Sequence, residues 1–164
     1  MRDYETVTHS FGPVFDEKSR ILILGSIPSV KSREINFYYG HPQNRFWKVI
    51  SAVLNTVPPT TTEEKTGLLL ENGIALWDVI ERCNIIGSSD SSIKNVIPND
   101  IYSLISELKI SRIFVNGAKA EELYNKFCFR QTKIRAVKLP STSPANASWT
   151  TERLIVEWKR LLNI

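Results

Sequence analysis

The chain has 164 residues, of which 42% are hydrophobic and 23% are charged, a length and composition that fit one compact domain. Its 21 Lys and Arg residues outnumber 17 Asp and Glu residues, and the formal net charge of +4 mildly favours a polyanionic partner. No apolar run reaches the roughly 20 residues of a membrane helix, and no hydrophobic signal segment opens the chain. Cys83 and Cys128 lie far apart and only two histidines accompany them, which argues against disulfides, an iron–sulfur cluster and structural zinc. We therefore expect a single cytoplasmic domain, residues 1–164, that binds neither a membrane nor a metal.

Four short apolar runs predict strands that are buried on both faces, as in a parallel sheet. They cover residues 20–25, 73–78, 112–117 and 135–140, each near a turn-forming residue. Helical spacing of apolar residues predicts helices over residues 46–53, 61–72, 101–108, 120–127 and 154–162. Candidate N-caps are Thr61, residues 98–99 and Ser148. The alternation predicts a three-layer α/β/α sandwich with a mainly parallel sheet of about four strands.

Ligands of such sheets bind at the carboxyl ends of the strands, so the loops that follow the strands are the candidate binding segments. The first loop (residues 25–47) reads GSIPSVKSREINFYYGHPQNRFW and contains neither a dinucleotide-binding GxGxxG nor a phosphate-binding GxxxxGK[ST] motif. Its three consecutive aromatic residues and its basic residues are instead suited to stacking on a planar ring and holding a phosphate. The second loop (residues 139–147) reads LPSTSPANA, and taken alone it is an ordinary turn-forming connection.

Together, the two loops resemble the signature motifs of the uracil-DNA glycosylase superfamily. Gly25-Ser-Ile-Pro-Ser29 continues into His41-Pro-Gln-Asn-Arg-Phe-Trp47, as in the mismatch-specific uracil/thymine branch, and Leu139-Pro-Ser-Thr-Ser-Pro-Ala-Asn146 resembles the hypoxanthine-DNA (deoxyinosine) glycosylases. The resemblance covers residues 21–162. It implies a monomeric base-excision glycosylase, without a cofactor, that flips a deaminated base of DNA and hydrolyses the base–sugar bond. Hypoxanthine is the first candidate base, and uracil, xanthine and mismatched thymine stay open.

Two substitutions separate this chain from the uracil-processing relatives. Ile27 stands where those relatives carry the Asn or Asp that positions the hydrolytic water, and Leu139 stands where the main uracil enzymes carry a His. The resemblance therefore assigns the catalytic role to Asn44, whose amide can orient a water. From its position alone, Asn44 is also a good cap for the following helix, and one side chain can do both.

The remaining candidate site residues form a base-binding set and a DNA-binding set. Tyr39 matches the position that stacks on the flipped base, and Asp78 matches the position that reads the edge of the base, although an Asp after a strand also caps turns. The base-binding set is Tyr39, Asp78, His41, Ser26 and Ile27. The DNA-binding set is Ser29, Lys31, Arg33, Arg45, Pro140, Ser141, Thr142, Ser143, Pro144 and Ala145, and residues 140–145 would enter the minor groove.

Two other functions remain open at this point. Ile27 and Leu139 also fit a protein that recognises damaged nucleic acid without cutting it. A small-molecule hydrolase could combine Ser26 or Ser141 with His41 and Asp78, although the chain has no GxSxG motif. Neither motif offers an obvious lysine nucleophile, so for a glycosylase we expect no β-lyase activity.

Overall fold

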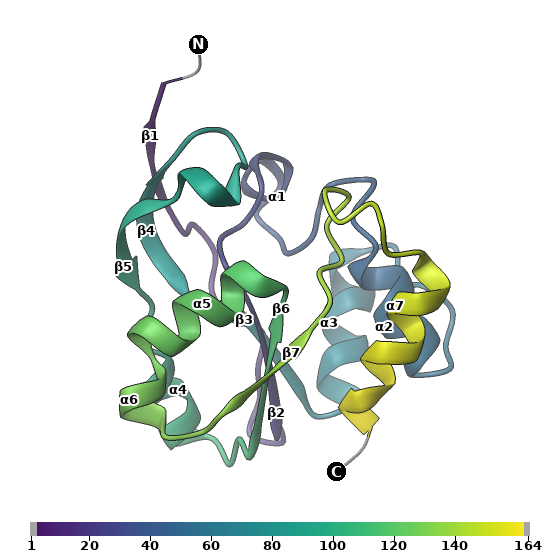
Figure 1. The fold of residues 1–164 in the computed structure, drawn as a ribbon. Coiled ribbons are helices and arrows are strands. Elements are labelled where there is room, and N and C mark those ends of the chain that lie inside the picture. Colours follow the sequence, from purple (N-terminus) through teal and green to yellow (C-terminus); the bar gives the residue numbers. More distant parts are fainter. Residues whose placement is uncertain (1–2, 163–164) are drawn as a thin grey trace.

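A four-stranded parallel sheet forms the centre of the structure, a computed structural model that describes residues 3–162 (Figure 1). The strands are β2 (Ile21–Gly25), β3 (Ile74–Asp78), β6 (Arg112–Asn116) and β7 (Ala136–Leu139), and their spatial order is β3-β2-β6-β7. All three pairings are parallel, which confirms the four predicted strands. Their carboxyl ends consequently meet at one edge of the sheet, where the first and second loops begin.

Helices cover both faces of this sheet (Figure 1). One side carries α2 (Phe46–Val53), α3 (Thr62–Glu71), α7 (Thr151–Trp158) and the 3-10 turn η2 (Lys159–Leu162), and the other carries α4 (Ile101–Glu107), α5 (Ala118–Phe127) and α6 (Phe129–Thr132). Alternate residues of β2 serve the two layers, because Leu22 and Leu24 join one hydrophobic cluster whereas Ile21 and Ile23 join the other. The predicted three-layer α/β/α sandwich is thus confirmed.

The helix caps match the prediction in one case and differ in two. The Thr61 hydroxyl accepts a backbone N–H from the first turn of α3, as expected. Asp100 and Thr150, rather than residues 98–99 and Ser148, cap α4 and α7. In both cases the preferred cap is a side-chain oxygen one or two residues closer to the helix, where it reaches the free N–H groups.

A second, antiparallel sheet was not predicted from the sequence. It contains β1 (Glu5–Thr8), β4 (Ile80–Ile85) and β5 (Lys94–Pro98) in the order β1-β4-β5. A single residue separates β3 from β4, so the chain passes directly from one sheet to the other. The β4–β5 connection, with the 3-10 turn η1 (Asp90–Ser92), lies near the short helix α1 (Val30–Ile35) at the carboxyl edge of the parallel sheet (Figure 1). No helix within residues 3–162 is long and apolar enough to cross a membrane.

Candidate functional site

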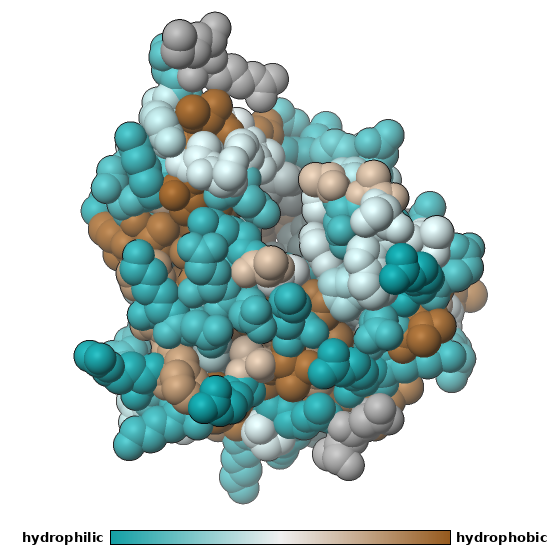
Figure 2. All heavy atoms as spheres, in the orientation of Figure 1, coloured by the Kyte–Doolittle hydropathy of each residue, from teal (hydrophilic) through white to brown (hydrophobic). Residues whose placement is uncertain are grey.

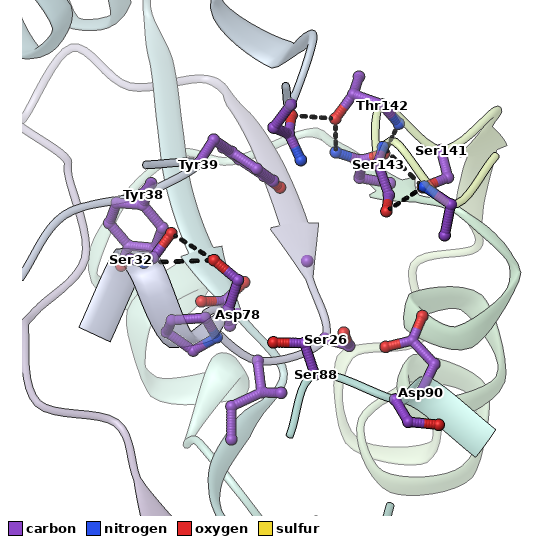
Figure 3. A pocket seen from close by; sticks show the side chains of 18 of the residues that line it. Ser26, Ser32, Tyr38, Tyr39, Asp78, Ser88, Asp90, Ser141, Thr142 and Ser143 are labelled. Atoms are coloured by element: carbon purple, nitrogen blue, oxygen red, sulfur yellow. Dashed lines mark hydrogen bonds between the residues drawn. The ribbon is translucent and has the colours of Figure 1, made fainter. Parts of the chain in front are cut away.

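A cavity of about 430 Å³ opens at the carboxyl edge of the parallel sheet, and we call it the edge cavity (Figures 2 and 3). Its walls come from both loops, from the ends of β3 and β6, and from the β4–β5 connection. The structure brings the following sequence-predicted residues to its lining: Ser26, Ile27, Ser29, Tyr39, Asn44, Asp78, Ser141, Thr142, Ser143 and Ala145. The described residues of the lining do not include His41, Lys31, Arg33, Arg45, Pro140 or Pro144. Its size lies within the range of small-molecule sites.

A chain of three polar side chains connects the first and second loops across this cavity. Asn44 Oδ1 accepts from the Phe46 backbone N–H at 2.9 Å and from the Thr142 hydroxyl at 2.9 Å. The same hydroxyl accepts from Asn116 Nδ2 at 3.0 Å, and Asn116 Oδ1 accepts from the Thr142 backbone N–H at 3.1 Å. Backbone N–H groups can only donate, so the two at Phe46 and Thr142 determine which end of each amide is the oxygen.

This polarity decides what Asn44 can offer to a ligand. Both acceptor positions of Oδ1 are occupied, by the Phe46 N–H and by the Thr142 hydroxyl. The remaining group is the Nδ2 amide, which carries two N–H donors. Asn44 therefore accepts from the first backbone N–H of α2 but is not the N-cap of that helix, because Arg45 occupies the cap position without a side-chain bond. The Asn44 amide can still donate hydrogen bonds into the edge cavity.

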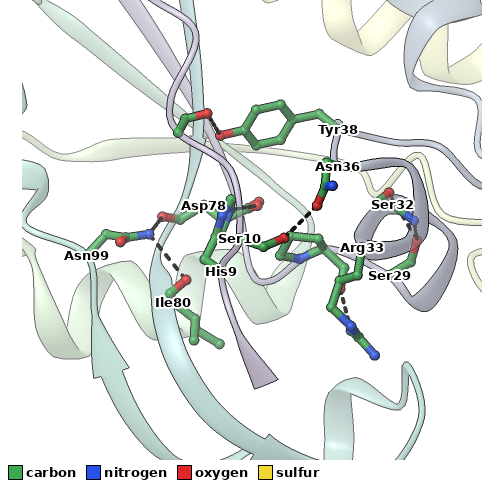
Figure 4. A network of polar contacts seen from close by, with 12 residues as sticks. His9, Ser10, Ser29, Ser32, Arg33, Asn36, Tyr38, Asp78, Ile80 and Asn99 are labelled. Carbon is green, nitrogen blue, oxygen red and sulfur yellow. Dashed lines mark hydrogen bonds and ion pairs between the residues drawn. The ribbon is translucent and has the colours of Figure 1, made fainter. Parts of the chain in front are cut away.

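Asp78 lies at the end of β3 with its carboxylate almost completely buried. His9 Nε2 lies 2.8 Å from Asp78 Oδ2, and the two side chains are 2% and 5% exposed (Figure 4). The other oxygen, Oδ1, packs against Gly25, where an added Cβ would lie only 2.4 Å away. The carboxylate bonds to His9 rather than to the following turn, so the turn-capping alternative for Asp78 does not hold. Asn99 instead secures this turn, since its Nδ2 donates to the carbonyl oxygens of Asp78 and Ile80.

Two adjacent tyrosines border the same region in different ways. The Tyr38 hydroxyl donates to the Gly12 carbonyl at 2.9 Å, and its ring is buried. Tyr39 adopts a positive φ of 53°, which a bulky residue rarely does, and its ring stacks on Phe46 with centroids 4.1 Å apart. Burial, aided by the nearby Asp78 carboxylate, raises the pKa of both phenols. Tyr39 points into the edge cavity, and within the described chain its hydroxyl has no hydrogen-bond partner (Figure 3).

Arg45 is the clearest correction within the predicted DNA-binding set. Its guanidinium donates to the carbonyl oxygens of Ser143 at 3.0 Å and Asn146 at 3.1 Å, and also to that of Trp149. The Arg45 backbone N–H donates to the Thr142 carbonyl. The side chain thus connects the second loop to the start of α2, and three of its N–H donors are used within the protein rather than on phosphate.

Other members of that set are also used internally. Thr142 is 0% exposed and forms part of the cavity wall, so it is not a surface contact. Arg33 donates to the Pro28 carbonyl at 2.7 Å and pairs with Glu5 at 3.3 Å. The Ser29 hydroxyl caps α1. Lys31 is half exposed and pairs with Glu34 on the same helix.

The two loop serines that line the edge cavity hold the second loop in shape. The Ser141 hydroxyl accepts from the Ser143 N–H, and the Ser143 hydroxyl accepts from the Ala145 N–H, each at 3.1 Å. Pro140 lies behind this rim, where its carbonyl accepts from the Trp158 indole at 2.9 Å. The short side-chain-to-backbone bonds pre-organise a loop that has no regular secondary structure.

His41 lies outside the edge cavity, contrary to the base-binding role predicted for it. Its Nδ1 accepts from the Gln43 backbone N–H at 3.0 Å, so the ring stabilises its own turn. The hydrolase triad considered from the sequence is therefore not assembled, because Asp78 bonds to His9 and not to His41. Within residues 3–162, no three His, Cys, Asp or Glu residues cluster as metal ligands would.

Two residues of this site are not among the predicted site residues. Asn116 ends a predicted strand at the ligand-binding edge, which is a usable signal, but Asn-Gly at this position equally indicates a turn, so the sequence alone does not assign the residue to the site. His9 gave no signal, because nothing local to the sequence places it beside a residue 69 positions away. The serine-rich segment of residues 88–91, which also lines the edge cavity, was missed together with the second sheet.

Comparisons with known proteins agree with the resemblance carried by the two loops. The family model described as the uracil DNA glycosylase superfamily matches residues 13–162. A Methanosarcina acetivorans protein described as hypoxanthine DNA glycosylase is 37% identical over 150 residues, covering 90% of this chain and 93% of that protein. A Methanosarcina barkeri protein of the same description is 33% identical over 115 residues, covering 68% and 72%. The solution NMR structure of a candidate uracil DNA glycosylase from M. acetivorans aligns with a TM-score of 0.79 and 36% identity, covering 92% of this chain and 93% of that chain.

Proposed function

Because this chain belongs to the uracil-DNA glycosylase superfamily and is a DNA glycosylase, we propose that it removes hypoxanthine from DNA. The relatives described as hypoxanthine DNA glycosylases supply the candidate base. The observation that carries the proposal is the Asp78 carboxylate, held at the wall of the edge cavity with one oxygen on His9. The reaction is hydrolysis, and none of the described residues that line the cavity is a lysine able to form a Schiff base.

Recognition of the base rests on the hydrogen-bond character of a deaminated purine. Hypoxanthine carries an N1–H donor, whereas adenine presents a lone pair at N1. A carboxylate can only accept hydrogen bonds, so Asp78 pairs with N1–H of hypoxanthine and repels N1 of adenine. Tyr39, whose ring points into the cavity, provides the surface on which the flipped base stacks. Uracil and xanthine also carry an N–H in such a position, and the assay below includes both bases.

The chemical step requires a water at C1′ of the deoxyribose and a leaving base that takes the bonding electrons. Asn44 presents N–H donors because its oxygen is occupied, so it binds the oxygen of the water and orients it without removing a proton. The C1′–N9 bond breaks with its electrons going to the base, the water adds to C1′, and the proton that the water loses passes to solvent or to the departed base. Positioning alone is a large part of such catalysis, and a flipped base in a closed cavity excludes competing water.

The test is alkali-revealed strand cleavage of duplexes that each carry one hypoxanthine, uracil, xanthine or mismatched thymine. Asn44→Ala is compared with the wild type and with Asn125→Ala, a matched change on the exposed side of α5. We expect cleavage at hypoxanthine by the wild type and the control, and a loss of about 100-fold or more in Asn44→Ala. The variant should have a lower melting temperature, because the Phe46 N–H and the Thr142 hydroxyl lose their acceptor, but at the assay temperature it should be folded and bind DNA as the wild type does.

Each contrary result removes a specific part of the proposal. A wild-type protein that cleaves uracil or thymine but not hypoxanthine contradicts the assigned base. Undiminished cleavage by Asn44→Ala contradicts the assigned catalytic residue and reduces Asn44 to its bond with α2. Tight binding of every duplex without cleavage contradicts the reaction itself and favours a protein that only recognises damage.

A further inference from the structure

His9 is buried directly behind Asp78 and has no role in the reaction as proposed above. It follows β1, and its backbone N–H donates to the Glu81 carbonyl of β4 at 2.7 Å, which fixes the segment in place. The rings of Phe11 and Tyr38 flank the imidazole, with centroid distances of 4.6 and 5.9 Å. The described lining of the edge cavity does not include His9, whose imidazole bonds to the lining residue Asp78 (Figure 4).

The direction of the hydrogen bond in this pair follows from the atoms in contact. A carboxylate only accepts hydrogen bonds, so with Asp78 as a carboxylate His9 Nε2 is the donor. The other ring nitrogen, Nδ1, is buried and has no partner within the described chain. An unpartnered acceptor is tolerated better in a protein interior than an unpartnered N–H, and this favours the tautomer with its hydrogen on Nε2.

We propose that His9 is a positioning residue that fixes the hydrogen-bond polarity of Asp78 toward the base. His9 occupies Oδ2, and Oδ1 sits in the notch left by the missing side chain of Gly25. These two contacts hold the carboxylate in one orientation at the wall of the edge cavity, so Oδ1 is the oxygen left to accept from the base. This inference rests on the proposed function, because it assumes that Asp78 reads the N1–H of hypoxanthine.

An Asp78→Asn variant exposes this role, because an amide has one acceptor end and one donor end. His9 would hold the amide oxygen, and the amide NH₂ would turn toward the base. Two donors, the amide N–H and hypoxanthine N1–H, would then face each other. In the opposite orientation the amide NH₂ would face His9 and the amide oxygen would face the base. His9 would then have to accept at Nε2 and carry its hydrogen on Nδ1, where the buried N–H would have no acceptor.

His9 can only donate toward residue 78, and replacing it by a side chain that can either donate or accept removes this restriction. The Nε2 amide of glutamine reaches about as far as Nε2 of histidine, so His9→Gln keeps the donor to the Asp78 carboxylate. Beside the amide of the Asp78→Asn variant, the same glutamine can flip and accept from the amide NH₂, which turns the amide oxygen back toward the base. The His9→Gln change is thus nearly neutral with Asp78 and favourable with Asp78→Asn.

The experiment is single-turnover cleavage of the hypoxanthine duplex by five proteins: wild type, His9→Gln, His9→Leu, Asp78→Asn, and the His9→Gln, Asp78→Asn double variant. We expect His9→Gln to remain within about threefold of the wild type, and His9→Leu and Asp78→Asn to fall about 10- to 100-fold. We expect the double variant to be about 10-fold faster than Asp78→Asn. Thermal unfolding of each protein separates a folding defect from an altered site, and the comparison of the double variant with Asp78→Asn does not depend on whether His9→Leu folds.

A double variant no faster than Asp78→Asn overturns the role of His9, as does a folded His9→Leu that is as active as the wild type. Loss of activity in His9→Gln that equals the loss in His9→Leu also overturns it, because donor character would then not matter. A wild-type protein that leaves hypoxanthine uncut contradicts the proposed function instead, and this result is read before any variant is compared.

Discussion

Replacing Thr142 by valine tests whether Thr142 supports the wall of the edge cavity or contacts DNA. The sequence placed Thr142 among the DNA contacts, whereas the structure buries it completely between Asn44 and Asn116. Valine has nearly the shape of threonine but lacks the hydroxyl. The change removes the two hydroxyl bonds and leaves the two backbone bonds, from the Thr142 N–H to Asn116 and from the Arg45 N–H to the Thr142 carbonyl.

The magnitude follows from the groups left without partners. Loss of a neutral hydrogen bond costs roughly 1 kcal/mol, and the valine removes two such bonds, while Asn116, which is partly exposed at the cavity wall, can turn its amide to water. We therefore expect Thr142→Val to lower the free energy of unfolding by about 1–2 kcal/mol, which in a chain of this size lowers the melting temperature by about 2–8 °C. Asn44 keeps its bond to the Phe46 N–H but loses its second donor, so we expect the maximal rate to fall about 10-fold or more through poorer orientation of the amide.

Thermal unfolding and single-turnover cleavage at saturating enzyme measure the two effects, and Thr142→Ser, which keeps the hydroxyl, is the matched control. We expect the serine variant to lie close to the wild type in both assays. A Thr142→Val protein with wild-type stability and maximal rate, but with weaker DNA binding, would refute the reasoning and restore the surface role. A serine variant as impaired as the valine variant would show that the methyl group matters rather than the hydroxyl.

Two further substitutions test the site, and a third prediction concerns the two buried cysteines. Arg45→Met should lower stability and the maximal rate but leave the salt dependence of DNA binding unchanged, whereas loss of a phosphate contact would reduce the slope of log Kd against log salt by about one. Gly25→Ala should reduce cleavage about 100-fold in a folded protein, because its Cβ displaces the Asp78 carboxylate; a fully active variant would contradict the packing. Burial raises the pKa of Cys128 to about 11 and also raises that of Cys83, so a thiol reagent should modify neither cysteine before unfolding. A raised pKa means that the folded state holds the thiol proton more tightly than the unfolded state does. The stability that Cys128 contributes in this way is present below the ordinary thiol pKa of 9.0 and is lost as the pH rises toward 11. Unfolding measured as a function of pH tests this.

The parallel sheet could be predicted because each of its strands has a recognisable local sequence pattern. Strand β2 is buried at every position, which requires the continuous apolar run seen at residues 21–25. The second sheet has no such pattern. Only one of the four residues of β1 is buried, and buried and exposed residues do not alternate regularly along β4. His9 was missed for this reason, because the pairing of β1 with β4 leads the chain to Asp78.

Arg45 shows a different limit of sequence reasoning. A cation in a motif that resembles a DNA-binding loop was interpreted as a phosphate contact, which is its simplest use. The second loop, however, has no strand or helix partner for several of its carbonyl oxygens, and buried carbonyls need donors. The guanidinium donates to two of these carbonyls, those of Ser143 and Asn146, and to that of Trp149 just beyond the loop. These carbonyls need a donor only once the loop has folded against α2.

One of the two absent catalytic side chains lies on the same loop that holds Asn44. Leu139, which replaces a histidine of the main uracil enzymes, is 0% exposed and belongs to the core cluster beside Trp158, so it offers nothing to a leaving base. Three residues further on, Thr142 holds the oxygen of Asn44 and thereby turns its amide N–H groups toward the cavity. Under the proposed function, the second loop does not stabilise the departing base, as the histidine does in the main uracil enzymes. It instead orients Asn44, the residue that positions the water. If that loop contacts DNA as proposed, the contact would be transmitted through Thr142 to Asn44, and the orientation of the Asn44 amide would depend on the position of the loop.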